Sequence, residues 1–165
     1  MKLTLDTTNI FDLFKQGKDC IKILIEDAHN GLCELVVTSR IYADIPEEPL
    51  ASELNKLSQL GIETIGTIAR WGVSYWGEDY WSGDETEELE SKIREIMFPG
   101  KEHEKHLNDI DHLIGHIINE RDYFITSDSH FLRRYKRLYD ELGVKVISPE
   151  EYVNSTRLTH RLEKV

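Results

Sequence analysis

The chain has 165 residues and a formal net charge of −11, with 39% hydrophobic and 31% charged residues. This length and composition predict a globular protein that needs neither disulfides nor a structural metal for stability. Its apolar runs are far shorter than the roughly 20 residues of a membrane span, its first residues lack the apolar core of a signal peptide, and Cys20 and Cys33 have no metal-binding spacing. We therefore expect a cytoplasmic protein without membrane association.

Charged residues are unevenly distributed along the chain. Acidic residues crowd the segment 84–95, whereas Arg133, Arg134, Lys136 and Arg137 form a basic group. A negative net charge slows the encounter with a polyanion. It therefore argues against indiscriminate nucleic-acid binding, but not against a local binding site.

Strand-like apolar segments alternate with helical periodicities along the chain. In the first part, we predict a strand at 3–5, a polar turn at 7–9, a helix over 21–28 closed by Gly31, a strand at 35–38, a helix from about 40 that Pro46 and Pro49 interrupt, and a helix over 50–57 that ends near Gly61. In the second part, we predict a short strand or turn at 62–68, a helix capped by Asp84, a helix over about 102–120, a strand at 123–127, a helix whose face runs from Leu132 to Leu142, a strand at 144–147 and a helix opened by Pro149.

This alternation predicts the fold class. Strands that alternate with helices pair in parallel through crossover connections. We therefore predict an α/β fold, a three-layer α/β/α sandwich with a mainly parallel central sheet. Residues 1–165 are expected to form a single domain, in which the acidic and aromatic segment at about 70–100 is an insertion.

Two aspartates, Asp6 and Asp128, directly follow predicted strands. In an open parallel sheet, ligands bind beyond the carboxyl ends of the strands, so both side chains are expected at the same edge. Each could instead cap the helix or turn that follows it, which is a common use of aspartate. Two such residues, with further acids in the chain, favour a shared site.

A third candidate lies on the predicted helix at 102–120. The apolar positions of this helix fill one arc, Asp111 falls at the edge of that arc, and Asp109 points to nearly the opposite side. A carboxylate at the margin of a core-facing surface is costly unless a cation meets it, and Gly115 would allow close approach of another group. We therefore predict that Asp111 is a ligand, with Asn108 at the rim. The alternative is a carboxylate bonded to neighbouring backbone.

Asp44, about a turn and a half into the helix after 35–38, is the fourth candidate, although it could be a solvated surface residue. Carboxylates that converge in one cleft repel each other unless a cation neutralises them. Hard oxygen ligands select Mg²⁺ or Mn²⁺ over Zn²⁺, and such a metal can activate water and neutralise charge on a phosphodiester.

The arrangement of these acids resembles the PIN-domain family. The matching segments are Leu3-Thr4-Leu5-Asp6-Thr7, Arg40-Ile41-Tyr42-Ala43-Asp44, Asp111-His112-Leu113-Ile114-Gly115, and Ile125-Thr126-Ser127-Asp128 with Phe131. They resemble the segments that carry the four acids of the family, and together they cover about residues 1–45 and 105–150. This chain has Asp44 where the family usually has Glu, and Thr8 followed by Asn9 where the family often has Asn.

The resemblance implies an activity, because members of the family are mostly Mg²⁺- or Mn²⁺-dependent ribonucleases, including VapC-type toxins. It implies hydrolysis of single-stranded RNA by a metal-activated water, with Asp6, Asp44, Asp111 and Asp128 as catalytic metal ligands, supported by Thr126 and Asn9. It further implies an RNA substrate, a protein partner or antitoxin, and a homodimer. The alternative is an inactive PIN-like module that binds RNA or a protein partner.

Histidines form a second stripe on the predicted helix at 102–120. His106, His112 and His116 lie with Asp109 nearly opposite the apolar arc. An i, i+4 histidine pair can chelate a transition metal, but such spacing specifies ligands loosely, and a solvated face is the preferred interpretation.

The basic group at 133–137 could be a solvated helix face or could contact phosphate. We predict nucleic-acid contact by Arg133, Arg134 and Arg137. The aromatic side chains of the predicted insertion could stack on unpaired bases, but we expect them to pack within the protein or against another subunit. These aromatic residues are Trp71, Tyr75, Trp76, Tyr80 and Trp81.

Overall fold

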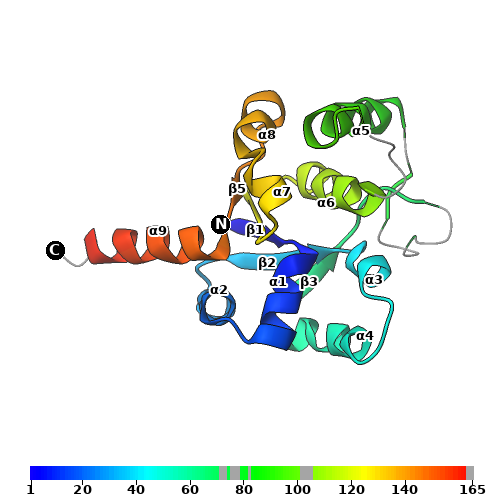
Figure 1. Cartoon of the computed structure of the whole chain (residues 1–165). Coiled ribbons are helices and arrows are strands. Elements are labelled where there is room, and N and C mark those ends of the chain that lie inside the picture. Colours follow the sequence, from blue (N-terminus) through cyan, green and yellow to red (C-terminus); the bar gives the residue numbers. More distant parts are fainter. Residues whose placement is uncertain (71–73, 75–78, 82, 101–105, 163–165) are drawn as a thin grey trace.

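The computed structural model describes residues 1–70, 74, 79–81, 83–100 and 106–162, with side chains as far as 155 (Figure 1). Helices cover both faces of a central sheet, which is the predicted three-layer α/β/α architecture with a PIN-like fold. The sheet is parallel throughout and has the order β3-β2-β1-β4-β5. Its strands are β1 (Lys2–Leu5), β2 (Glu34–Thr38), β3 (Ile62–Ile65), β4 (Tyr123–Ile125) and β5 (Val146–Ile147).

The helices divide between the two faces. One face carries α1 (Thr7–Phe11), a π-helical turn (Asp12–Gln16), α2 (Asp19–His29), α3 (Ile41–Asp44), α4 (Leu50–Glu53) and α9 (Pro149–Leu162). The other carries α5 (Asp84–Met97), α6 (Leu107–Ile118), α7 (Ser129–Leu132) and α8 (Tyr135–Leu142). Right-handed crossovers explain this division, because β1 to β3 run outward in one direction and β4 to β5 in the other.

Alternating strand side chains supply a hydrophobic core on each side of the sheet. Leu3, Leu5 and Ile125 pack into the core on the α1–α2 face, whereas Phe124 and Val146 pack into the core beneath α5–α8. The chain reverses its direction across the sheet between β1 and β4. The carboxyl ends of these two strands therefore form the edge at which a parallel sheet binds its ligands.

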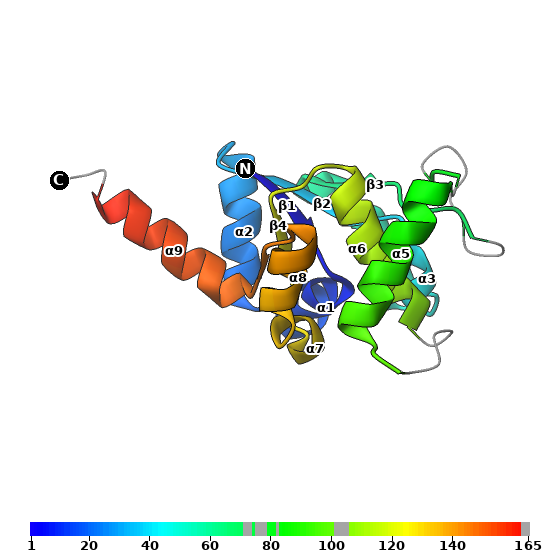
Figure 2. The same ribbon diagram turned by 90° about the horizontal axis from the view of Figure 1, so that it is seen from above.

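The peripheral helices are seen most clearly from above (Figure 2). α5 lies alongside α6, and α9 packs on α2 before its end extends away from the rest of the molecule in both views. None of the helices in the described ranges is long and apolar enough to cross a membrane.

The structure corrects several predicted elements. The expected polar turn at 7–9 is the first turn of α1, with Asp6 at its N-cap, because Asn9 completes a capping box. The predicted helix from Leu132 to Leu142 is divided into α7 and α8, and the helix expected to be capped by Asp84 is capped one residue earlier, by Gly83. The ambiguous segment at 62–68 contains a strand, β3. The expected start of α6 near 102 lies outside the described residues.

Candidate functional site

Hydroxyl groups connect the carboxyl ends of β1 and β4. Asp6 is 3% exposed, and its Oδ2 accepts hydrogen bonds from Thr126 Oγ1 at 2.7 Å and Thr8 Oγ1 at 2.8 Å. The backbone N–H of Asp128 donates to Thr126 Oγ1 at 2.9 Å. Asp128 also caps α7, because its Oδ1 accepts from the backbone N–H of His130 at 2.7 Å. Thr126 thus orients Asp6 and joins it to the segment that carries Asp128.

A buried polar group supports these strand ends from behind. Asn9 is fully buried; its Oδ1 accepts from the backbone N–H of Asp6 at 3.3 Å, and its Nδ2 donates to Ser127 Oγ at 3.3 Å. Ser127 donates in turn to Asp12 at 2.7 Å, and Lys18 pairs with the same Asp12 oxygen at 2.8 Å. Every carboxylate and amide in this group has a partner, so the group fixes the strand ends at low desolvation cost.

Asp44, at the end of α3, is held by three donors. Thr7 Oγ1 at 2.6 Å and His112 Nε2 at 2.7 Å donate to its Oδ2, and Asn108 Nδ2 at 2.5 Å donates to its Oδ1. Burial alone would raise the pKa of Asp44, but the hydrogen bonds and the charge of His112, with the bonds from Thr7 and Asn108, lower it. Burial likewise opposes protonation of His112, but the contact with Asp44 and the nearby acids raise the pKa of His112.

Asp109, in the first turn of α6, lies among the other acids. Its burial and the charges of Asp6, Asp44 and Asp128 raise its pKa to about 7, although the charge of His112 acts in the opposite direction. A carboxylate whose protonation responds to three acids from three other segments must lie close to all of them. The expectation that Asp109 points away is therefore wrong. We call Asp6, Asp44, Asp109 and Asp128 the acidic cleft.

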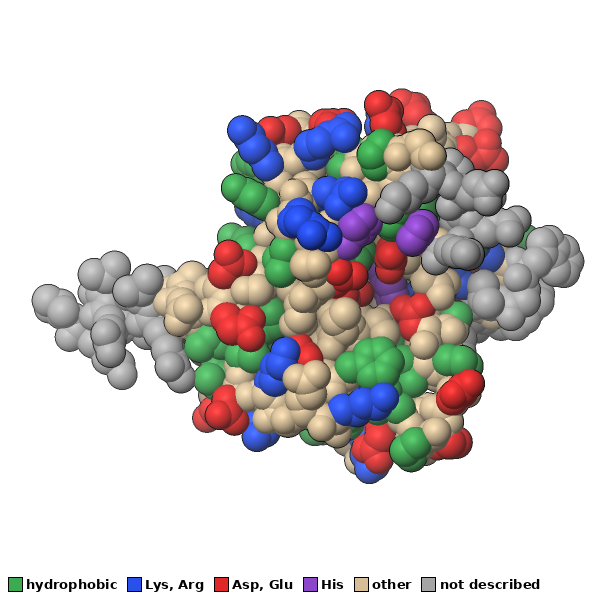
Figure 3. Space-filling view, viewed as in Figure 1, with side chains coloured by type: hydrophobic (Ala, Val, Ile, Leu, Met, Phe, Trp, Pro, Cys, Tyr) green, Lys and Arg blue, Asp and Glu red, His purple; other side chains and the backbone are tan. Residues whose placement is uncertain are grey.

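The space-filling view shows this face of the molecule (Figure 3). Acidic and histidine side chains gather in a hollow between the helices of the upper layer and those of the lower layer, and Lys and Arg side chains lie above and to the left of the hollow. The hollow is thus negative at its centre and positive along one border, although the whole chain is acidic.

Asp111 is not part of the acidic cleft, which corrects its expected placement. It is fully buried, with Arg40 Nε at 2.9 Å and Arg70 Nη2 at 2.6 Å from its carboxylate oxygens. Arg40 also donates to the carbonyl of Ile68 at 2.8 Å, and Arg70 pairs with Glu90 of α5 at 3.0 Å. The reasoning that a cation must meet this carboxylate holds, but the cations are two guanidinium groups rather than a metal.

The surroundings of α6 explain the error. All residues from Ile110 to His116 are buried, because the helix lies between the sheet and α5. Gly115 allows this close packing, since a Cβ built there would lie 2.8 Å from Thr38 Cγ2 and 3.2 Å from the carbonyl oxygen of Gly66. An amphipathic projection assumes one solvated face, and α6 has none over these residues.

The expected solvated histidine stripe is also wrong for two of its members. His112 is 1% exposed and His116 is 2% exposed. His116 Nδ1 lies 3.0 Å from Thr4 Oγ1, its ring meets Phe124 edge-on, and burial with the charge of Arg121 lowers its pKa to about 3. The spacing i, i+3 between Asp109 and His112 was the available signal that both lie on one side of the helix.

The basic group is only partly available to a ligand. Arg134 donates to the carbonyls of Ile96 and His130 at 3.1 and 3.2 Å, so it ties α7 to the end of α5. Arg137 pairs with Glu141, and Arg133 is exposed. The structure therefore places Arg133 on the surface and gives Arg134 a structural contact.

The aromatic segment is described only in part. Trp71, Tyr75 and Trp76 lie outside the described residues. Trp81 is 84% exposed and Tyr80 is 51% exposed, so Trp81 does not pack within the chain as expected.

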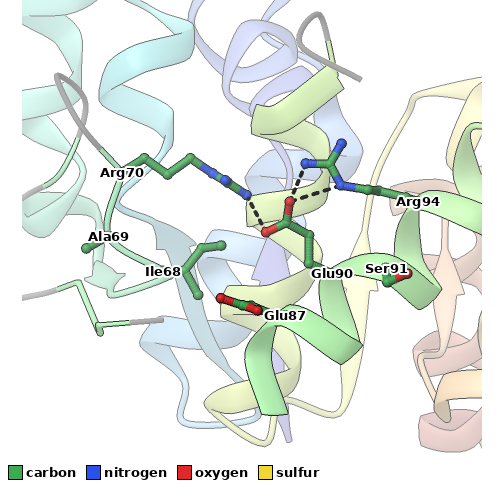
Figure 4. Close-up of a pocket in the computed structure, with 7 residues that line it drawn as sticks. All are labelled: Ile68, Ala69, Arg70, Glu87, Glu90, Ser91 and Arg94. Atoms are coloured by element: carbon green, nitrogen blue, oxygen red, sulfur yellow. Dashed lines mark hydrogen bonds and ion pairs between the residues drawn. The ribbon is translucent and has the colours of Figure 1, made fainter. Parts of the chain in front are cut away.

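A separate hollow of about 480 Å³ lies between α5 and the residues that follow β3 (Figure 4). Glu90 accepts from Arg70 and Arg94 at its wall, so the charges there neutralise each other. None of the acids of the acidic cleft lines it. The lining residues are Ile68, Ala69, Arg70, Glu87, Glu90, Ser91 and Arg94.

Comparison with known proteins supports the fold. No family model and no curated protein sequence matches the chain. A solved structure of VapBC2 from Rickettsia felis, bound to a DNA fragment from their promoter, contains a similar chain. The similarity has a TM-score of 0.57 at 15% sequence identity and covers 90% of this chain and 98% of that chain. At this identity, the similarity shows the fold alone.

Proposed function

We propose that this protein is a Mg²⁺- or Mn²⁺-dependent ribonuclease that hydrolyses single-stranded RNA, with the acidic cleft as its active site. The observation that carries the proposal is the raised pKa of Asp109, caused by burial and by the charges of the three other acids. A concentration of carboxylates that disfavours its own ionisation is costly to the fold, and a divalent cation would remove that cost. Its position at the carboxyl ends of β1 and β4 also fits the general location of ligand sites in parallel sheets.

The residues fit a hard divalent cation. Asp6, Asp109 and Asp128 offer carboxylate oxygens without a neighbouring Lys or Arg contact, and oxygen ligands of this kind suit Mg²⁺ and Mn²⁺. Within the described ranges, no three Asp, Glu, His or Cys side chains already form a group tight enough to hold a metal ion. The cation would therefore draw the carboxylates together.

The chain's own residues would bind and orient the reactants. Thr126 and Thr8 hold Asp6, and the end of α7 holds Asp128, so both carboxylates are fixed before a ligand arrives. When bound, the metal would neutralise charge on the phosphodiester and activate the attacking water. Arg133, on the exposed surface after Asp128, would contact the RNA backbone.

We also propose a protein partner, of the antitoxin kind implied by the resemblance to VapC-type toxins and supported by the fold similarity to VapBC2. A homodimer is the other assembly implied by the resemblance. Light scattering of the purified chain, alone and with the protein encoded next to it, tests both.

Cleavage of a labelled single-stranded RNA panel tests the activity. We expect cleavage with Mg²⁺ or Mn²⁺, none with EDTA, and none for Asp128→Asn, because this change removes a charge while keeping the size of the side chain. Asp140→Asn, an exposed change on α8, is the matched control and should keep activity. Equal cleavage by Asp128→Asn and the unchanged protein would indicate a contaminant and refute the mechanism.

The alternative, a binding module without catalysis, has one observation in its favour. All three described donors to Asp44 come from the protein, so little of that carboxylate is left for a metal. A protein that binds Mn²⁺ but cleaves none of the RNAs would support this alternative.

A further inference from the structure

His112 connects three segments that surround the acidic cleft. The ring is 1% exposed, and its Nδ1 lies 2.5 Å from Thr38 Oγ1 at the end of β2. Its Nε2 lies 2.7 Å from Asp44 Oδ2 at the end of α3 and 3.1 Å from Thr7 Oγ1 at the start of α1. Both ring nitrogens are therefore engaged, and the ring cannot turn without breaking a buried hydrogen bond.

The direction of each hydrogen bond follows from the groups involved. A carboxylate only accepts, so His112 Nε2 must carry a proton and donate to Asp44. The Thr7 hydroxyl donates its proton to Asp44 Oδ2 at 2.6 Å, so it can only accept from the ring. Oδ2 thus receives two donors, whereas Oδ1 receives one, from Asn108 at 2.5 Å. The remaining ligand capacity of Asp44 lies mainly on Oδ1.

We propose that His112 is a positioning residue for Asp44, and this inference rests on the proposed function. By holding Oδ2, His112 would keep the carboxylate charged and in one orientation beside Asp6 and Asp109, and would leave Oδ1 for the metal. Without the donor, repulsion from the neighbouring acids would favour a turned carboxylate. Loss of an outer partner of a metal ligand typically weakens metal affinity about 10- to 100-fold.

Two substitutions at this position separate positioning from packing. The side-chain nitrogen of glutamine can take the place of Nε2, whereas asparagine is too short to reach Asp44 and can bond only to Thr38. We expect His112→Gln to keep the Mn²⁺ dissociation constant within about threefold of the unchanged protein. We expect His112→Asn to raise it about 10- to 100-fold. Isothermal titration of the full chain with Mn²⁺ measures both, and urea unfolding checks that the two variants lose similar stability.

A third variant keeps the test decisive if His112→Asn does not fold. Thr38→Val removes the hydroxyl that holds Nδ1 and touches none of the acids through that hydroxyl, so it should also weaken Mn²⁺ binding. Equal affinities for His112→Asn and His112→Gln, or unchanged affinity in Thr38→Val, would overturn the positioning role. Absence of Mn²⁺ binding in the unchanged protein would instead refute the proposed function, so the two failures are distinguishable.

Discussion

Replacement of Asp109 by asparagine is expected to stabilise the metal-free protein and to abolish its response to Mn²⁺. The pKa of this carboxyl is raised from 3.8 to about 7 in the folded state. The folded protein therefore holds a proton between these pH values that the unfolded chain releases. The resulting contribution to stability is present below pH 4 and is lost as the pH rises through 7.

The magnitude follows from the pKa difference. One pKa unit corresponds to about 1.4 kcal/mol, so ionised Asp109 costs the metal-free fold up to about 4 kcal/mol. Asp109 is partly exposed, and screening by solvent lowers this value to about 2 kcal/mol. The asparagine variant removes the charge. Its advantage in the free energy of unfolding should rise from near zero at pH 4 to about 2 kcal/mol at pH 8.

Urea unfolding from pH 4 to pH 8, in EDTA and in Mn²⁺, provides the assay. In Mn²⁺ the unchanged protein should gain stability, more at pH 8 than at pH 6, because the metal competes with the proton at Asp109. The variant should gain much less, and Asp140→Asn should behave as the unchanged protein does. A variant with the same stability at pH 8 and the same Mn²⁺ response would refute the placement of Asp109 in the acidic cleft.

Three further substitutions test the packing around α6. Asp111→Asn leaves two buried guanidinium groups without a full counter-charge and should cost about 3–5 kcal/mol of stability in urea unfolding; a loss below about 1 kcal/mol would contradict the ion-pair role. Gly115→Ala places a Cβ 2.8 Å from Thr38 and should lower stability by about 1–3 kcal/mol, whereas a neutral effect would mean that the strand and helix can separate freely. His116, whose folded pKa is about 3 against an ordinary 6.5, should cause a stability loss as the pH falls from 6.5 towards 3, because the unfolded chain takes up the proton first; the pH dependence of unfolding should therefore be shallower in His116→Gln, and an unchanged slope would contradict the buried neutral ring.

The fold could be predicted because its signals are local. The strand at 35–38 and the helix over 21–28 declare themselves through β-branched runs and helical spacing, and their alternation restricts the topology to a parallel sheet. The turn expected at 7–9 was missed, because the polar residues there serve as an N-cap and a capping box rather than as a loop.

The candidate site was harder to predict where it depends on packing. Asp6 and Asp128 follow strands, so topology alone brings them to one edge. The choice between Asp109 and Asp111 depends on how α6 is rotated between the sheet and α5, and on Arg70, which lies 41 residues away from its partner Asp111. Helical periodicity in one segment carries no information on either point.

The position of a bound Mn²⁺ tests the central claim most directly. Crystals of the protein soaked in Mn²⁺, with diffraction collected at an energy where manganese scatters anomalously, would locate the ion without reference to any side chain. We predict an anomalous peak among the carboxylates of Asp6, Asp109 and Asp128, with Asp111 still paired to its arginines. A peak at Asp111, or none in the acidic cleft at saturating Mn²⁺, would contradict the proposed metal site.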